Sequence, residues 1–193
     1  MSKGHATRHI GKGREENLKN PALPNSTKVV RLVIVPPGRP IVTTRSPSRS
    51  DVLVVTDEEG KLHPKTWLGD GLVDHEEAHH QHRGTVLIVK GLDRDQIEWQ
   101  CDVPFRVSQI EKTAGHHFQN FKGPNYPFMM GLDRLTELRG GPGQPIRSGP
   151  VKVILNRITG RPIEWKQLYK AHFELKIGRT WKPLDPDFYC DWR

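Results

Sequence analysis

The sequence predicts a β-rich α+β protein with one mixed or antiparallel sheet, one or two short helices and extended terminal segments. Short β-branched runs that end at Pro or Gly recur along the chain, which is the pattern of strands joined by loops. The 193 residues contain 18 Gly and 16 Pro, a content typical of a loop-rich globular protein. No apolar run reaches the ~18 residues that a membrane-spanning helix requires. We therefore expect one compact domain with tails.

Apolar runs predict the strands of the first half. Residues 28–35 are rich in Val and Ile and stop at Pro36, which cannot continue a sheet ladder. Residues 97–101 and 105–110 alternate apolar with polar side chains, which is the period of a half-buried strand. Further strands are expected at 41–44, 52–56 and 85–90.

The helices are predicted in the second half. Leucines recur every three positions over residues 130–138, and Gly140 follows, so a short helix is expected there. A strand is predicted at 151–155. From residue 163 the large apolar side chains first follow helical spacing and then alternate, which predicts about two helical turns that run into a strand over 173–177.

These expectations divide the chain into a basic arm, a body, a connector and a C-terminal segment. Gly and Pro interrupt the first 27 residues, which contain almost no large apolar side chains and cannot build a core. The expected parts are a flexible basic arm at 1–27, a β-rich body at 28–139, a Gly/Pro-rich connector at 140–150, and a strand-helix segment with a tail at 151–193 that packs on the same body.

Positive charge is concentrated at the N-terminus. Residues 1–50 carry ten Lys and Arg against two acids, a net charge of +8, which equals the net charge of the whole chain. Residues 51–100 carry five basic against eleven acidic residues, a net charge of −6. A basic arm on a near-neutral body suits phosphate contact, because each neutralised phosphate releases condensed counterions. The alternative is a tail that serves only solubility.

The leading functional hypothesis is a non-enzymatic nucleic-acid-associated binding or assembly protein, of the ribonucleoprotein or virus and phage structural type. A second set of contacts is expected at 115–128, because bases stack on aromatic rings, although these rings could instead fill the core beneath a long loop. The residues expected to contact nucleic acid are Lys3, Arg8, Lys12, Arg14, Lys19, Arg31, Arg39, Arg45, Arg49, His117, Phe121 and Lys122.

A histidine-rich segment at 74–82 is the second candidate site. Residues 75–79 match the pattern H-E-x-x-H, in which two imidazoles one helical turn apart bind zinc and the Glu activates the metal-bound water. The motif resembles that of zinc metallopeptidases of the zincin type. The resemblance implies that His75 and His79 are zinc ligands and that Glu76 is the general base. Candidates for a third ligand are His82, Glu98, Asp102, His116 and His117. The alternative is a solvated polar turn or short helix with titrating imidazoles.

Three functional hypotheses follow from these observations. The leading one has no enzyme activity and no cofactor, and its partner is DNA, RNA or an acidic protein surface within a larger assembly, with no membrane. The first alternative is a zinc-dependent hydrolase, and the second is a protein-binding scaffold subunit. An intracellular location is expected, because Cys101 and Cys190 lack C-x-x-C spacing and no apolar signal segment follows the N-terminus.

Overall fold

The computed structural model shows a protein built from two packed β-sheets. It describes residues 26–36, 52–68, 71–81, 87–91, 93–113, 126–128, 137–153, 158–160 and 166–192. Strands dominate these residues, which confirms the expected β-rich character. The single expected sheet is wrong, because the strands form two mixed sheets.

The first sheet has the strand order β4-β3-β2-β1-β6-β9. β1 lies parallel to both β2 and β6, whereas the other neighbouring pairs are antiparallel. β1 is therefore hydrogen-bonded along both of its edges. The strands are β1 (Thr27–Val35), β2 (Val52–Glu58), β3 (Lys61–Leu68), β4 (Gly71–Asp74), β6 (Gln96–Cys101) and β9 (Ile146–Arg147).

The second sheet has the order β5-β12-β10-β7-β8, and β11 also pairs with β10. β11 and β12 share one edge of β10. Residues 173–177 of β10 pair with β11, and residues 166–170 pair with β12. β7 pairs with the opposite edge of β10. The strands are β5 (Ile88–Lys90), β7 (Phe105–Lys112), β8 (Leu138–Gly140), β10 (Lys166–Ile177), β11 (Thr180–Leu184) and β12 (Asp187–Asp191).

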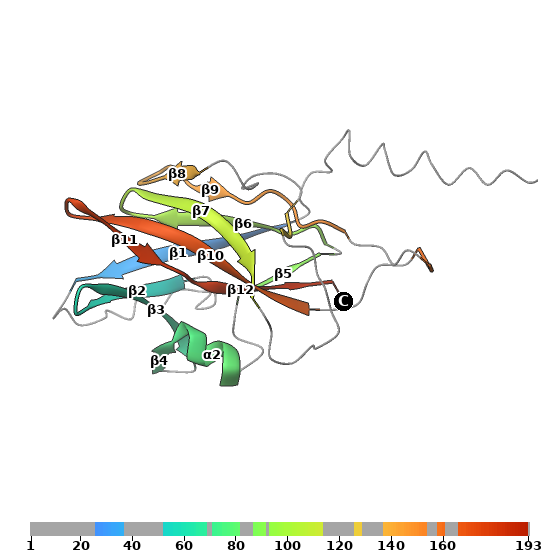
Figure 1. Cartoon of the computed structure of the whole chain (residues 1–193), viewed down its shortest axis with the longest axis horizontal. Helices are drawn as coiled ribbons and strands as arrows, with labels where there is room; N and C mark the ends of the chain where they lie inside the picture. The colour runs from blue at the N-terminus through green and yellow to red at the C-terminus, as the bar shows by residue number, and fades with distance from the viewer. Residues whose placement is uncertain are drawn as a thin grey trace, which may run out of the picture.

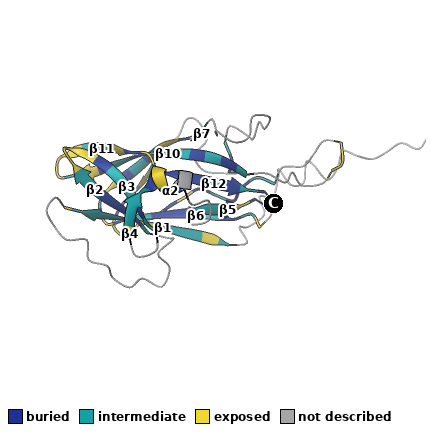
Figure 2. Ribbon diagram, turned by 90° about the horizontal axis from the view of Figure 1, so that it is seen from below, coloured by how far each residue is buried: buried dark blue, intermediate teal, exposed yellow. Residues whose placement is uncertain are grey.

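The two sheets enclose one apolar core (Figure 1). Trp99 of β6 meets Phe173 of β10 edge to face with ring centroids 5.4 Å apart, so aromatic rings from the two sheets touch directly. Figure 2 shows buried residues along β6, β10 and β12, between the layers. The removal of these large apolar side chains from water is the main force that holds the sheets together.

A β-bulge adjusts β7 to this core. Phe105, Val107 and Ile110 are all buried, although strict alternation would place Ile110 on the opposite face from Val107. The pairing register between β7 and β10 shifts between His172 and Phe173, which leaves Ser108 as the extra residue. The bulge therefore lets one strand turn all three apolar side chains inward.

Most predicted strands are present, and one predicted helix is absent. The strands expected at 28–35, 52–56, 97–101 and 105–110 are confirmed, and 85–90 is represented by the shorter β5. The helix expected from residue 163 is wrong over its described part, because β10 continues without interruption from Lys166 to Ile177. Gln167, Tyr169 and Ala171 are buried at every second position there, as a strand requires.

Other expectations fall partly outside the described residues. The strand expected at 41–44 lies outside them, and so does most of the helix expected at 130–138, whose last residue, Leu138, begins β8. At 151–155 the described part is an isolated bridge between Val151 and Phe128. Within 140–150, β9 pairs with β6, and Ser148 is buried. The helix among the described residues is α2 (His75–Gln81), which is too short to cross a membrane.

The sandwich has two distinct ends. At the arm end, the start of β1 meets the turn that joins β5 to β6. The β2–β3 hairpin lies at the far end, because β1, β2 and β6 all run from the arm end toward it. The β10–β11 hairpin lies there too, because the N–H of Lys176 donates to the carbonyl of Pro104, just after β6. In Figure 1 these hairpins lie opposite the C-terminus of the chain.

Gly91 at the arm end packs directly against the indole of Trp192. A Cβ atom at residue 91 would lie 2.1 Å from Cδ1 of that ring. We expect Gly91→Ala to lower the free energy of unfolding by about 1–3 kcal/mol, because the buried ring must move. Urea denaturation measures the change. Gly141→Ala is the matched control, since its added Cβ would meet its nearest atom at 3.6 Å, and an equal loss in both variants would contradict this account.

Candidate nucleic-acid interface

Arg31 is the one residue of the expected nucleic-acid-contacting set that the structure describes. It is exposed in β1 between the buried Val30 and Leu32, so its side chain points away from the core on the outer face of the first sheet. The other members of the set lie outside the described residues, namely Lys3, Arg8, Lys12, Arg14, Lys19, Arg39, Arg45, Arg49, His117, Phe121 and Lys122.

The basic segment joins the sandwich at a buried carboxylate. The hydroxyl group of Ser26, immediately before β1, donates a hydrogen bond to Oδ1 of Asp95. Oδ2 of Asp95 accepts the backbone N–H of Lys90 at 2.9 Å. The Asp95 carbonyl accepts the N–H of Val151 at 2.9 Å. Asp95 is only 2% exposed, so three chain segments far apart in sequence are joined at one buried residue.

Backbone and side-chain bonds extend this junction along β1. The N–H of Gln96 donates to the Ser26 carbonyl at 3.0 Å, and the Gln96 side-chain amide donates to the Thr27 hydroxyl at 2.8 Å. The first residues of β1 are thus fixed to β6 by side chains as well as by the strand ladder. The N-terminal segment therefore joins the body at Ser26, whose position is fixed by these hydrogen bonds.

The turn from β5 to β6 explains why an Asp occupies position 95. The N–H of Arg94 donates to the Gly91 carbonyl at 3.1 Å, and Arg94 has a left-handed backbone with φ of 51°. Asp side chains favour such turns because they accept hydrogen bonds from nearby backbone N–H groups. Sequence patterns alone did not point to Asp95 or Ser26. A turn-forming Asp after a strand is a visible signal, but its partner lies 69 residues away.

The histidine helix places His75 in the core and not at the surface. Asp74 caps α2, because its Oδ1 accepts the N–H of Glu76 at 2.9 Å. His75 is 2% exposed, and its Nε2 donates to the carbonyl of Asp187 in β12 at 2.8 Å. Ala78 is buried as well, so one side of α2 packs against the sheets. His75 therefore ties the helix to the second sheet.

The remaining zinc candidates are not brought together in the described part of the chain. Glu76 is exposed on α2, while the side chain of His79 and all of His82, His116 and His117 lie outside the described residues. Asp102 is exposed between β6 and β7. No group of three metal-ligating side chains occurs among the residues that the structure describes.

Glu98 is buried and forms an ion pair with the exposed Arg147. Its Oε1 accepts a hydrogen bond from Gln100 at 2.8 Å, and its Oε2 accepts one from Arg147 at 2.7 Å. The hydrogen bond from Gln100 has the largest effect on the pKa of Glu98, and the bond from Arg147 comes next. Both lower this pKa because they stabilise the charged carboxylate. This pairing neutralises Arg147 of β9 on the outer face of the first sheet.

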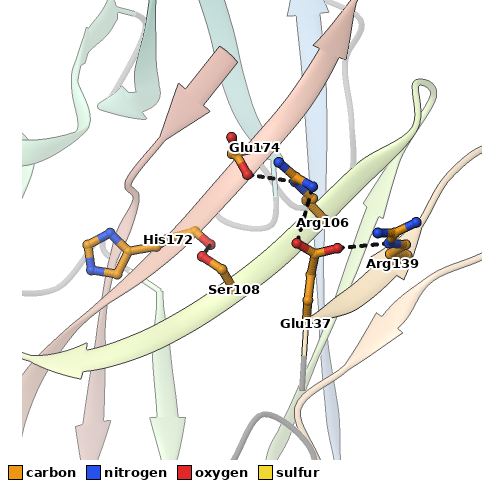
Figure 3. A network of polar contacts seen from close by, with 6 residues as sticks. All are labelled: Arg106, Ser108, Glu137, Arg139, His172 and Glu174. Atoms are coloured by element: carbon orange, nitrogen blue, oxygen red, sulfur yellow. Dashed lines mark hydrogen bonds and ion pairs between the residues drawn. The ribbon is translucent and has the colours of Figure 1, made fainter. Parts of the chain in front are cut away.

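Cations on the outer face of the second sheet are neutralised in the same way (Figure 3). Arg106 bonds Glu174 at 2.6 Å and lies 3.2 Å from Glu137, whose other oxygen accepts from Arg139 at 2.8 Å. The Arg106 guanidinium also lies 4.7 Å from the ring centroid of Trp181. The partners of Arg106 come from two strands, β10 and β11, and from the residue that precedes β8, so this network links neighbouring parts of the sheet face.

A scan against protein-family models, a search of curated proteins and a search of solved structures gave no match. The chain's own charge distribution and geometry therefore carry the functional inference.

The buried position of His75 makes the stability of the protein depend on pH. Burial is the largest influence and lowers the pKa of His75, while the Asp187 carbonyl and the nearby charges of Asp74 and Glu76 act in the opposite direction. The unfolded chain binds a proton at this histidine below about pH 6.5, but the folded chain resists doing so. Acidification below that pH therefore favours unfolding through this residue.

We expect His75→Gln to remove this part of the pH dependence, because glutamine keeps an N–H donor but does not titrate. The free energy of unfolding of the wild-type protein should fall relative to that of the variant by up to about 1.4 kcal/mol per pH unit below about pH 6.5. Urea denaturation from about pH 7.5 to about pH 5 measures the difference. If the free energy of unfolding of the two proteins changed equally with pH, His75 would not contribute to the pH dependence of stability.

Proposed function

We propose that this chain is a non-enzymatic binding and assembly protein that holds nucleic acid through its basic N-terminal segment, with the β-sandwich as the rigid body that anchors it. The observation that carries the proposal is the junction at Ser26. There a segment that carries five Lys and Arg against two acids meets a strand that pairs with β6 and then with β2, and whose start is fixed by Asp95.

The position of β1 suits a strand that bears load. Residues 27–32 pair with β6 and residues 31–35 pair with β2, so a pull on the N-terminal segment is opposed first by the β6 ladder and then by the β2 ladder. An edge strand would be opposed by one ladder only. Phosphate contacts made before Ser26 are therefore transmitted directly to the middle of the first sheet.

The rest of the described charge also supports a role for the N-terminal segment. On the outer faces of the sandwich, carboxylates neutralise Arg106, Arg147 and Lys65, with Glu58 as the partner of Lys65 at 2.5 Å. Paired cations of this kind attract phosphate weakly, because a carboxylate already occupies them. The first 50 residues carry ten Lys and Arg against only two acids, a net charge of +8, and five of these ten cations precede Ser26.

The zinc-hydrolase alternative gains no support from the described residues. Nε2 of His75 is already bonded to the Asp187 carbonyl, and Glu76 points to solvent. We therefore propose no metal chemistry. An acidic protein surface remains the competing partner, and it is distinguished by the binding experiment that follows.

The proposal is tested with a variant in which five arm cations become Gln, namely Lys3, Arg8, Lys12, Arg14 and Lys19. Fluorescence anisotropy measures the affinity for labelled single-stranded DNA, RNA and duplex DNA between about 50 and 200 mM salt. If all five side chains contact phosphates, the slope of log K against log salt should decrease in magnitude by about 3.5 for single strands and about 4.5 for duplex.

The matched control changes the same charge on the body by replacing exposed cations with Gln, namely Lys61, Arg139, Arg147, Lys176 and Arg179. The control should keep the wild-type slope. Equal slopes for wild type, arm variant and control would contradict a role for the arm. A wild-type protein that binds none of the three probes would contradict nucleic-acid binding altogether and favour the scaffold alternative.

A further inference from the structure

We propose that the nucleic acid held by the basic segment continues onto the sandwich at the arm end, where Lys28, Lys90 and Arg94 contact its phosphates. These three residues are called the exit cations below. The inference rests on the proposed function and assigns to the body a phosphate-binding surface that no sequence pattern indicates.

The fold brings the backbones of the exit cations close to Asp95. Lys28 lies two residues after Ser26, whose hydroxyl bonds Asp95, and it pairs in register with Ile97. The backbone N–H of Lys90 donates to Asp95, and Arg94 directly precedes it. Each exit cation is therefore within two residues of a contact with the same buried carboxylate. The sequence separates Lys28 from the other two by more than sixty positions.

Folding changes the charge that this end presents to solvent. Residues 90–95 are neutral as a sequence, with Lys90 and Arg94 against Asp93 and Asp95. In the structure Asp95 is buried, and both of its carboxylate oxygens accept internal hydrogen bonds. Asp93 and Lys90 are exposed, and Arg94 and Lys28 are half-buried. The turn thus keeps the Asp95 carboxylate from direct contact with a ligand, while Lys90 is exposed and Arg94 is partly exposed.

Nearby charges leave this excess in place. Lys166 and Asp191 face each other in register across β10 and β12 beside Lys90, and they add one charge of each sign. Within the described residues, no ion pair involves an exit cation, whereas Arg106 and Lys182 are held by Glu174 and Asp57 at 2.6 and 2.5 Å. The exit cations therefore form no ion pair with a described residue, and the carboxylates nearest to them in register and in sequence are Asp191 and Asp93.

Continuity with the basic segment distinguishes the arm end from the far end. Lys61, Lys176 and Arg179 are exposed at the far-end hairpins and also form no ion pair with a described residue. A polyanion bound before Ser26 is tethered next to the exit cations, so its local concentration is high there and low at the far end. Lys28 is the next cation in the sequence after Lys19, so a path of phosphates bound before Ser26 reaches the exit cations before any other part of the body.

The backbone of Arg94 provides a clean test. A left-handed φ of 51° is uncommon for a long side chain, and Asn adopts it more readily. Arg94→Asn therefore removes the charge without adding backbone strain. The test variant combines Lys28→Gln, Lys90→Gln and Arg94→Asn. The matched control combines Lys61→Gln, Lys176→Gln and Arg179→Gln at the far end.

Anisotropy titrations with the labelled DNA, RNA and duplex probes measure the salt dependence of the full-length proteins. Because each exit cation is expected to neutralise one phosphate, the slope for the exit-cation variant should decrease in magnitude by about 2 for single strands and about 2.7 for duplex. The far-end control should match wild type. Urea denaturation checks that each variant folds, and the double variant of Lys90 and Arg94 replaces the triple one if Lys28→Gln unfolds the chain.

The arm variant described under the proposed function is measured in parallel, so that the two ideas fail separately. A reduced slope for the arm variant, with identical slopes for the exit-cation variant and the far-end control, overturns this inference and leaves the proposed function standing. An unchanged slope for the arm variant contradicts the proposed function. Reduced slopes for the arm and exit-cation variants, with an unchanged far-end control, support both.

Discussion

One buried carboxylate holds the arm end of this protein together. Asp95 accepts hydrogen bonds from the Ser26 hydroxyl and from the backbone of Lys90, and its carbonyl accepts the N–H of Val151. β1 belongs to the first sheet and β5 to the second, so this residue links the two layers where they meet. A buried carboxylate is tolerated only when such bonds replace its hydration, and here they set the point at which the N-terminal segment leaves the body.

This constraint relates the architecture to the charge. The inner faces of the sheets are filled by aromatic and aliphatic side chains, and the outer faces carry cations that are matched by carboxylates, such as Arg106 with Glu174. At the far end, an ion pair between Lys182 of β11 and Asp57 of β2 joins the two sheets. The body therefore supplies rigidity. The cations that form no ion pair with a described residue and lie next to the N-terminal segment are the exit cations, whereas Lys61, Lys176 and Arg179 lie at the far end. The proposed division of labour between arm and body follows from this distribution.

The sequence predicted strands where apolar runs were long, as in β1, and failed where polar residues share the buried face. The sequence predicts a helix over only the first part of β10, because Leu168 and Tyr169 suit helical spacing, and a strand over 173–177. The inward side of that first part includes Gln167, whose amide donates to the carbonyl of Thr113. The sequence does not predict β3, because Pro64 lies within it and proline is rare inside strands. In the structure β4 pairs with β3 only from Lys65 onward, so Pro64 lies outside that ladder. Of the candidate site, the sequence predicted the charge, but not the contact between residues 26 and 95, because no local pattern encodes a tertiary hydrogen bond.

The central claim is that the Ser26–Asp95 bond fixes the base of the arm, and a double-mutant cycle tests it most directly. Ser26→Ala in the wild-type background should lower the free energy of unfolding by about 1.5–3 kcal/mol, because the lost bond is to a charged group. In the Asp95→Ala background the same change should have almost no effect, which gives a coupling energy of similar size. Equal effects of Ser26→Ala in both backgrounds would mean that the two side chains do not act together and would contradict the claim.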